Sequence, residues 1–264
     1  MSRTRKQAED WYRHPKYYEA IFGADTAREL DFLEAVNALY GTGGRTWLEP
    51  ACGAGGRGAA AARRGYTLIG YDVSPEMLAH ARQRLPPSLR RRVHLSLDRM
   101  ESFAPRRWRG RVDLAFNLVS TFRYLDSEEA ALSHLRHTRE LLRPEGVYVL
   151  GFHLTDYART TVEHERWVGR VGQEGVICNT REWPPDRRRR RSRMRNRLEI
   201  IGPRGRRRIE TNWYFRTWNE REAEVLLTRA GFQLVGLYTF DAAIDEPISW
   251  DSNRLDRILI LARR

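Results

Sequence analysis

Short apolar runs alternate with amphipathic segments over much of the chain. Strands that alternate with helices are typical of an α/β protein whose sheet is covered by helices on both faces. The apolar runs predict a strand that starts at Thr46 and further strands at residues 66–71, 92–97, 112–119, 147–152, 233–240 and 255–262. The pattern therefore predicts a seven-stranded α/β sheet.

Helical spacing marks several segments between these strands. Residues 26–40 place Leu30, Leu33, Val36 and Leu39 on one side of a helix, which ends at a glycine-rich turn. Pro15 suits the first turn of an earlier helix in an aromatic-rich segment. Other helices are predicted at 75–85, 127–142 and 218–230.

The pattern changes after residue 156. Partial alternation of apolar and polar residues at 160–168, 171–181, 194–200 and 207–214 predicts an antiparallel insert after the fifth strand. We therefore expect four parts. They are an N-terminal helical cap (1–43), a Rossmann-like core (44–155), an antiparallel lid insert (156–216) and the end of the core (217–264).

A turn of small residues follows the first strand. Its letters read Glu-Pro-Ala-Cys-Gly-Ala-Gly-Gly from Glu49, and small residues let a backbone turn tightly against a ligand. Asp72 ends the second strand, where a carboxylate can bind two ribose hydroxyls or simply cap the next turn. The sequence thus predicts a nucleotide-like ligand at the carboxyl end of the first strand.

These motifs resemble those of class I S-adenosylmethionine-dependent methyltransferases. Glu49 takes the place of the acidic residue that opens the first motif, Gly53 matches a later glycine, and Ala51 replaces the first one. Residues 70–78 are similar to the second motif and contain Asp72, Val73 and Met77. The resemblance implies a Rossmann-like fold, S-adenosyl-L-methionine as cofactor, and a closing antiparallel strand near the sheet edge.

The resemblance also implies cofactor contacts farther along the chain. Asp98 and Met100 follow the third strand, where the family holds the adenine, although a surface turn is the alternative. The fourth strand carries Asn117, and in the family the end of this strand lies beside the methionine part of the cofactor. A buried amide satisfied by backbone is the alternative for Asn117.

Acceptor contacts are predicted from the cap and from the ends of the later strands. His153 lies just past the fifth strand, as a base, a substrate contact or a structural histidine. We place His153 and Tyr18 in the catalytic group and Tyr12, Tyr17 and Arg123 among the substrate contacts. The alternative for the tyrosines is a helix docked on the core.

The chain has 264 residues and a formal net charge of +13, almost entirely from arginine. Such a charge is consistent with a nucleic-acid partner, but no aromatic-interleaved recognition motif accompanies it, so a solvated surface is favoured. The arginine run at 187–191 has two interpretations, a solvated loop or a phosphate-binding site, and the solvated loop is again favoured. Its two cysteines give no zinc pattern, and the sequence has no membrane span or signal peptide, so we expect a cytoplasmic protein without a metal.

The lid insert resembles that of small-molecule N-methyltransferases. A neutral amine needs no strong base, whereas an alcohol needs a base or a metal. The sequence therefore predicts methyl transfer to a small-molecule acceptor, and favours an amine nitrogen over an alcohol. The alternatives are a methyltransferase that acts on RNA or protein, and a non-catalytic cofactor-binding module; the oligomeric state does not follow from the sequence.

Overall fold

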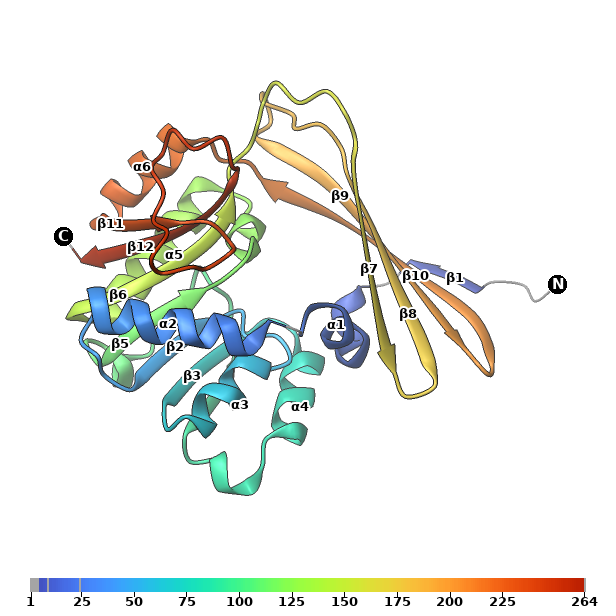
Figure 1. Ribbon diagram of the computed structural model, residues 1–264, viewed down its shortest axis with the longest axis horizontal. Helices are drawn as coiled ribbons and strands as arrows, with labels where there is room; N and C mark the ends of the chain where they lie inside the picture. Colours follow the sequence, from blue (N-terminus) through green and yellow to red (C-terminus); the bar gives the residue numbers. More distant parts are fainter. Residues whose placement is uncertain (1–4, 9, 24, 264) are drawn as a thin grey trace.

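The computed structural model describes residues 5–8, 10–23 and 25–263, and its strands form two β-sheets (Figure 1). The first sheet alternates with helices along the chain and forms the larger part of the molecule. The second stands beside it and consists mostly of long hairpins. The short helix α1 lies between the two (Figure 1).

The first sheet has seven strands in the order β11-β12-β6-β5-β2-β3-β4. β12 runs antiparallel to both of its neighbours, whereas β2 pairs in parallel with β3 and β5. This confirms the predicted seven-stranded sheet with its closing antiparallel strand. Its strands are β2 (Thr46–Pro50), β3 (Thr67–Asp72), β4 (Val93–Leu97), β5 (Val112–Asn117), β6 (Leu142–His153), β11 (Phe232–Tyr238) and β12 (Asp256–Arg263).

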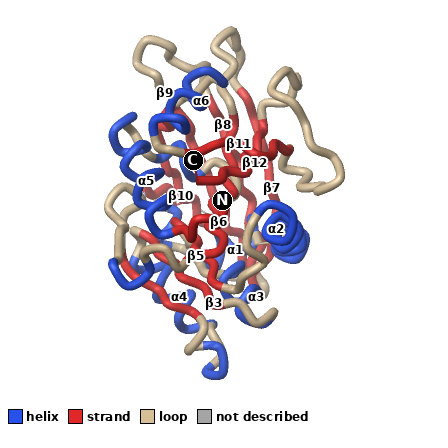
Figure 2. The backbone as a smooth tube through the Cα atoms, turned by 90° about the vertical axis from the view of Figure 1, so that its left-hand side faces the viewer, coloured by secondary structure: helices blue, strands red, loops and turns tan. Residues whose placement is uncertain are grey.

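Helices cover both faces of this sheet, as predicted (Figure 2). Leu33 and Ala61, from α2 and α3, pack with Trp47 on one face, and Leu135 and Leu226, from α5 and α6, belong to the core on the other. The helices are α1 (Pro15–Phe22), α2 (Thr26–Tyr40), α3 (Gly56–Arg63), α4 (Pro75–Arg84), α5 (Glu128–Leu141) and α6 (Glu220–Arg229). Single 3₁₀ turns are η1 (Trp11–Arg13), η2 (Pro87–Leu89), η3 (Arg106–Trp108) and η4 (Thr121–Tyr124).

Local sequence sets where several helices begin. The hydroxyl of Ser74 accepts the N–H of Met77 at the start of α4, and Pro75 fills the first helical position. Asn219 and Glu222 form a reciprocal capping box at the start of α6. These caps fix the ends of the helices that follow β3 and precede β11.

The second sheet confirms the antiparallel insert after the fifth strand of the core. Its order is β1-β10-β9-β8-β7, and all pairs are antiparallel except β1 with β10. We call β7–β10 the lid. Its strands are β7 (Glu163–Val171), β8 (Glu174–Glu182), β9 (Arg191–Gly202) and β10 (Gly205–Arg216), and β1 is Arg5–Ala8.

One half of the lid packs on α1. Tyr17 and Ile21 of α1 share an apolar cluster with Val176, Cys178 and Leu198 of the lid. The contact is close, because a Cβ on Gly169 of β7 would lie 2.3 Å from the carbonyl oxygen of Ala20. The lid and the N-terminal helix therefore form one packed layer.

The structure corrects several details of the sequence-based prediction. β6 begins at Leu142 instead of residue 147, because Leu142 pairs with Val112 of β5 across an irregular register. Leu39 is 63% exposed, and Tyr40 packs against the core in its place. Strand β1 was not predicted, since its four residues pair only with an edge of the lid.

Candidate functional site

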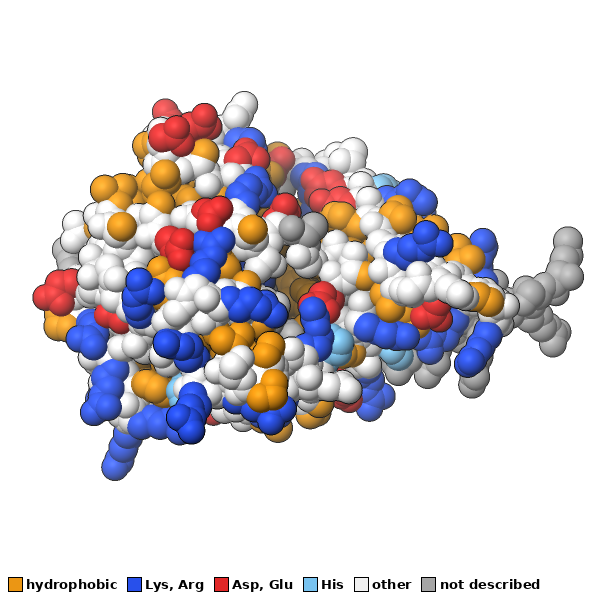
Figure 3. Space-filling model, turned by 60° about the horizontal axis from the view of Figure 1, so that its bottom comes forward, with side chains coloured by type: hydrophobic (Ala, Val, Ile, Leu, Met, Phe, Trp, Pro, Cys, Tyr) orange, Lys and Arg blue, Asp and Glu red, His pale blue; other side chains and the backbone are white. Residues whose placement is uncertain are grey.

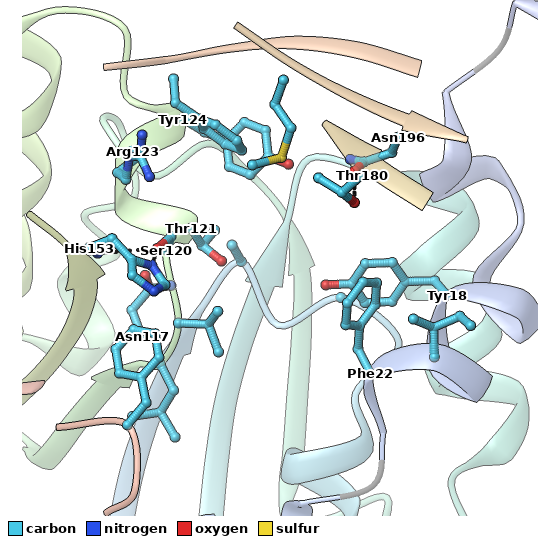
Figure 4. A pocket seen from close by; sticks show the side chains of 18 of the residues that line it. Tyr18, Phe22, Asn117, Ser120, Thr121, Arg123, Tyr124, His153, Thr180 and Asn196 are labelled. Carbon is cyan, nitrogen blue, oxygen red and sulfur yellow. Dashed lines mark hydrogen bonds between the residues drawn. The ribbon is translucent and has the colours of Figure 1, made fainter. Parts of the chain in front are cut away.

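A cavity of about 790 Å³ lies between the core sheet and the lid. Figure 3 shows the molecule hollowed between these two parts, and Figure 4 shows the cavity from close by. One wall consists of the segments that follow β2, β5 and β6, and the opposite wall comes from α1 and the inner face of β7–β9. The carboxyl ends of parallel strands converge at one edge of a sheet, which is where ligands bind in such folds.

The turn after β2 has the backbone of a ligand-binding turn. Gly53 and Gly55 have φ of +54° and +71°, and a Cβ on Gly53 would meet no described atom within 4 Å. Ala51 has φ of +51°, so it adopts the left-handed conformation normally given to glycine, at a cost of about 1 kcal/mol. The replacement of the first motif glycine by alanine thus leaves the turn intact.

The start of α3 also faces the cavity. Gly55, Gly56 and Arg57 line the wall there, and no side chain caps the helix at Gly55. The first N–H groups of a helix carry partial positive charge and bind carboxylates or phosphates. The carboxylate of an amino-acid-like ligand fits this position.

Glu49 provides a buried carboxyl group in the same wall. It is 3% exposed, its Oε1 lies 3.7 Å from Nη1 of Arg57, and its Oε2 has no hydrogen-bond partner among the described residues. Burial raises the pKa of Glu49 to about 8, although Arg57 opposes this rise. Arg57 itself is held by two short hydrogen bonds to Glu29. An orphaned carboxyl oxygen at this place fits the ammonium group of S-adenosylmethionine.

Asp72 stabilises the glycine turn through hydrogen bonds to its backbone. Its two carboxylate oxygens accept the N–H groups of Gly53 and Ser74, each at 2.8 Å. Burial raises its pKa, and the side chain is not part of the cavity wall. The structure thus shows Asp72 as a turn-capping carboxylate, and its predicted ribose contact stays a prediction.

Asn117 and His153 stand at the ends of β5 and β6 and line the cavity (Figure 4). The amide of Asn117 donates to the carbonyl oxygen of Pro50 at 2.9 Å, which ties β5 to β2, and its Oδ1 has no partner among the described residues. Nδ1 of His153 lies 2.7 Å from the hydroxyl of Ser120, which also accepts the backbone N–H of His153. Burial and the nearby Arg123 lower the pKa of His153, so the ring is neutral at pH 7.

Aromatic residues of the cap close the cavity on the side of α1. Tyr12 and Tyr18 line it, and the hydroxyl groups of Tyr12 and Tyr124 are 3.0 Å apart. Burial raises the pKa of both groups, so these hydroxyls are neutral. Tyr17 points away from the cavity and donates to Glu174 on the lid. It secures α1 to the lid, and its predicted substrate contact lies outside the cavity wall.

Arg123 lines the cavity, and its guanidinium group binds to side chains of the lid. Its Nη2 donates to Glu182 at 3.0 Å and to Ser192 at 2.8 Å, and the side chain is buried. The ion pair joins η4 of the core to two lid strands. The observed geometry is that of a positioning residue at the base of the lid.

Besides Asp72, four predicted cofactor contacts lie outside the cavity wall. Val73 is 60% exposed, and Met77 is completely buried in α4. Asp98 accepts hydrogen bonds from Arg99 and Ser102, and Met100 packs against the core. The structure places these residues beside the turn, after β3 and β4, and their roles stay predictions.

The sequence analysis missed the part of the wall that comes from the lid. Glu165, Thr180 and Asn196 occupy neighbouring register positions on β7, β8 and β9 and line the cavity. Alternation identified these strands, but it does not tell which face meets a ligand. The only available signal was the presence of polar residues on the otherwise apolar inner face.

Comparisons with known proteins agree with this site. Residues 48–146 match the family model described as a methyltransferase domain. Residues 48–146 thus form a methyltransferase domain, and the match supports an enzyme that uses S-adenosylmethionine as its cofactor. A comparison with curated proteins finds no match to the sequence.

Three solved structures share the fold over nearly the whole chain. DesVI from Streptomyces venezuelae has a TM-score of 0.70 at 19% identity and covers 96% of this chain and 94% of its own. The sugar N-methyltransferase KedS8 from Streptoalloteichus sp ATCC 53650 has a TM-score of 0.72 at 18% identity, covering 100% and 97%. CalS10, an amino pentose methyltransferase from Micromonospora echinaspora, has a TM-score of 0.66 at 19% identity, covering 90% and 89%.

Two further features concern the described residues only. No group of three or more His, Cys, Asp or Glu in ranges 5–8, 10–23 and 25–263 is arranged to hold a metal ion. Within the same ranges, no helix is long and apolar enough to span a membrane.

Proposed function

We propose that this enzyme transfers the methyl group of S-adenosylmethionine to the nitrogen of a small-molecule amine in the cytoplasm. The observation that carries the proposal is the cavity itself, whose volume of about 790 Å³ lies within the range of small-molecule sites. It is bounded by the glycine turn on one side and by polar lid residues on the other. The similar structures described as a sugar N-methyltransferase and an amino pentose methyltransferase support an amine acceptor.

The residues of the first wall would hold the cofactor. In this proposal Glu49 binds its ammonium group, the N–H groups at the start of α3 bind its carboxylate, and the turn at Gly53 gives it room. Asn117 would offer its unpartnered Oδ1 nearby. When bound, S-adenosylmethionine supplies an electrophilic methyl group on a positively charged sulfur.

The remaining residues align the acceptor and exclude water. The lid and α1 enclose the cavity, which favours an in-line approach of the amine nitrogen. The hydroxyl of Ser120 accepts the backbone N–H of His153, so we assign its own proton to the bond with Nδ1. The neutral imidazole then carries its proton on Nε2, where it can donate a hydrogen bond to the molecule that receives the methyl group.

A methyltransferase that acts on RNA or protein is the second candidate, motivated by the net charge of +13. Part of the arginine run is already used within the molecule. Arg190 pairs with Glu222 at 2.8 Å, and Arg187 lies over the ring of Tyr157. These contacts leave less of the run for phosphates, which favours the small-molecule proposal.

Methyl-labelled S-adenosylmethionine, incubated with the enzyme and a cell extract, tests the proposal directly. We expect the label in the metabolite fraction. Label confined to RNA or protein would support the second candidate instead. Cofactor binding without label in any fraction would support a non-catalytic module.

A further inference from the structure

The inner face of the lid has an apolar half and a polar half. Trp167, Cys178 and Leu198 belong to the cluster that α1 covers. Two residues away on the same strands and face are Glu165, Thr180 and Asn196, which line the cavity together with Trp167. Figure 4 shows Thr180 and Asn196 on the lid side, opposite His153 and Asn117. We call Glu165, Thr180 and Asn196 the acceptor row.

Asn196 offers a donor that the protein leaves unused. The residue is 2% exposed, and its Oδ1 accepts the hydroxyl of Thr180 at 2.6 Å. This bond orients the amide so that Oδ1 faces Thr180. The Nδ2 group has no hydrogen-bond partner in the described part of the chain. The Nδ2 group is accessible from the cavity, where an oxygen atom of a ligand could accept its N–H.

Glu165 offers a negative charge without a counter-ion. Among the described residues, its two acidic neighbours have partners, since Glu163 lies 3.3 Å from Arg159 and Glu182 lies 3.0 Å from Arg123. Glu165 makes no ion pair with a described residue. Glu165 is solvent-exposed in the cavity wall, and its partial removal from water together with the charges of Glu182 and Glu163 raises its pKa.

We infer that the acceptor row recognises an amine that enters as a cation and carries a hydroxyl or carbonyl oxygen. This inference rests on the proposed function and names the class of its acceptor. The cation pairs with Glu165 on entry and releases one N–H proton to water before its nitrogen lone pair attacks the methyl group, and the oxygen accepts an N–H of Asn196.

The register limits the size of this acceptor. Glu165 pairs with Thr180, and Thr180 pairs with Asn196, so the outer members are two strand spacings apart, or about 10 Å between Cα atoms. The two side chains project into the same cavity and narrow this gap. A compact molecule of the size of one substituted ring can contact both.

The first test separates the acceptor by charge. A metabolite extract that supports methyl transfer is passed over a cation-exchange resin at pH 7, and both fractions are assayed with labelled S-adenosylmethionine. We expect acceptor activity in the salt eluate. Activity in the flow-through would overturn the cationic acceptor while leaving methyl transfer to a small molecule in place.

The second test uses the purified acceptor and matched variants. Glu165→Gln should raise KM for the acceptor tenfold or more, with kcat and S-adenosylhomocysteine affinity nearly unchanged, because only the charge is removed. Glu163→Gln, on the same strand and face but already neutralised by Arg159, should raise KM less than threefold. Asn196→Ala should raise KM about fivefold through loss of one hydrogen bond.

These results separate the inference from the proposed function. Glu165→Gln with a KM within twofold of the wild type would overturn the role of the acceptor row. Label found only in macromolecules, or nowhere, would remove the proposed function and this inference with it.

Discussion

Glu49 is the most unusual single residue in the cavity wall. Its pKa is about 8 in the folded protein, above the usual 4.5, so it holds its proton at neutral pH. Between these two values the folded protein binds more protons than the unfolded chain. The stability that this group contributes therefore falls as the pH rises through that window.

We predict that cofactor binding releases a proton from Glu49. The ammonium group of S-adenosylhomocysteine, which binds like the cofactor, should lower the pKa of this carboxyl group and release close to one proton at pH 7. Affinity should then rise between about pH 6 and 8. Calorimetry in buffers with different ionisation heats measures the release, and Glu49→Gln should abolish it. Release that persists in this variant would contradict the ammonium contact.

Substitutions of His153 can distinguish a role as hydrogen-bond donor from a role as general base. His153→Gln keeps an N–H donor near the position of Nε2 but cannot act as a base, so we expect kcat within about threefold of the wild type. His153→Ala loses the donor and should lower kcat about tenfold. Steady-state kinetics at saturating acceptor measures both. A loss of 100-fold or more in His153→Gln would instead indicate general-base catalysis.

At the scale of elements, the contact between α1 and the lid shapes the cavity. Tyr17 donates to Glu174 on β8, and Glu19 of α1 contacts His80 and Arg84 of α4. One short helix thus connects the lid to the helix that follows Asp72. A disturbance at the lid should therefore reach the cofactor side.

We predict that Gly169→Ala weakens this connection. The new Cβ would lie 2.3 Å from the backbone oxygen of Ala20, so α1 or β7 must shift at a cost of about 1–3 kcal/mol. Thermal unfolding should show the loss, together with weaker S-adenosylhomocysteine binding. Gly175→Ala on the neighbouring strand is the control, because its Cβ would meet nothing closer than 3.9 Å. Equal melting temperatures for the two variants would contradict the prediction.

The sequence predicted the core elements well and the lid wall poorly, for a physical reason. The glycine turn and Asp72 are local features. The positive φ angles that the turn requires are therefore visible in the sequence from Glu49 onward. The acceptor row depends on which half of a sheet α1 covers. That contact joins residues such as Ala20 and Gly169, which lie far apart in the chain. No local pattern encodes it.

At the scale of the whole molecule, the charge is divided between outside and inside. The net charge is +13, whereas the lid side of the cavity contains Glu163, Glu165 and Glu182. Figure 3 shows Lys and Arg side chains on both sides of the opening. The outer surface is therefore basic, whereas on the lid side of the cavity Glu163 and Glu182 are paired with Arg159 and Arg123, and Glu165 has no ion pair with a described residue.

This division predicts a weak salt dependence of turnover. We expect kcat/KM for the acceptor to change less than threefold between about 50 and 200 mM salt, because short-range pairing inside the cavity is screened little. An RNA substrate that makes six or more phosphate contacts would lose about 10³-fold in affinity over the same range. Initial rates at several salt concentrations decide between the two, and a steep fall would favour the RNA alternative.

The two halves of the lid have a consequence for how such an enzyme can change. The apolar half, around Cys178 and Leu198, is committed to holding α1, so substitutions there endanger the fold. In the polar half, Glu165, Thr180 and Asn196 make no side-chain hydrogen bond or ion pair to a described element outside the lid, although Thr180 and Asn196 join β8 to β9. Specificity and stability are thus encoded at separate positions of the same strands. New acceptors can be selected in a library restricted to the polar half, with little risk to folding.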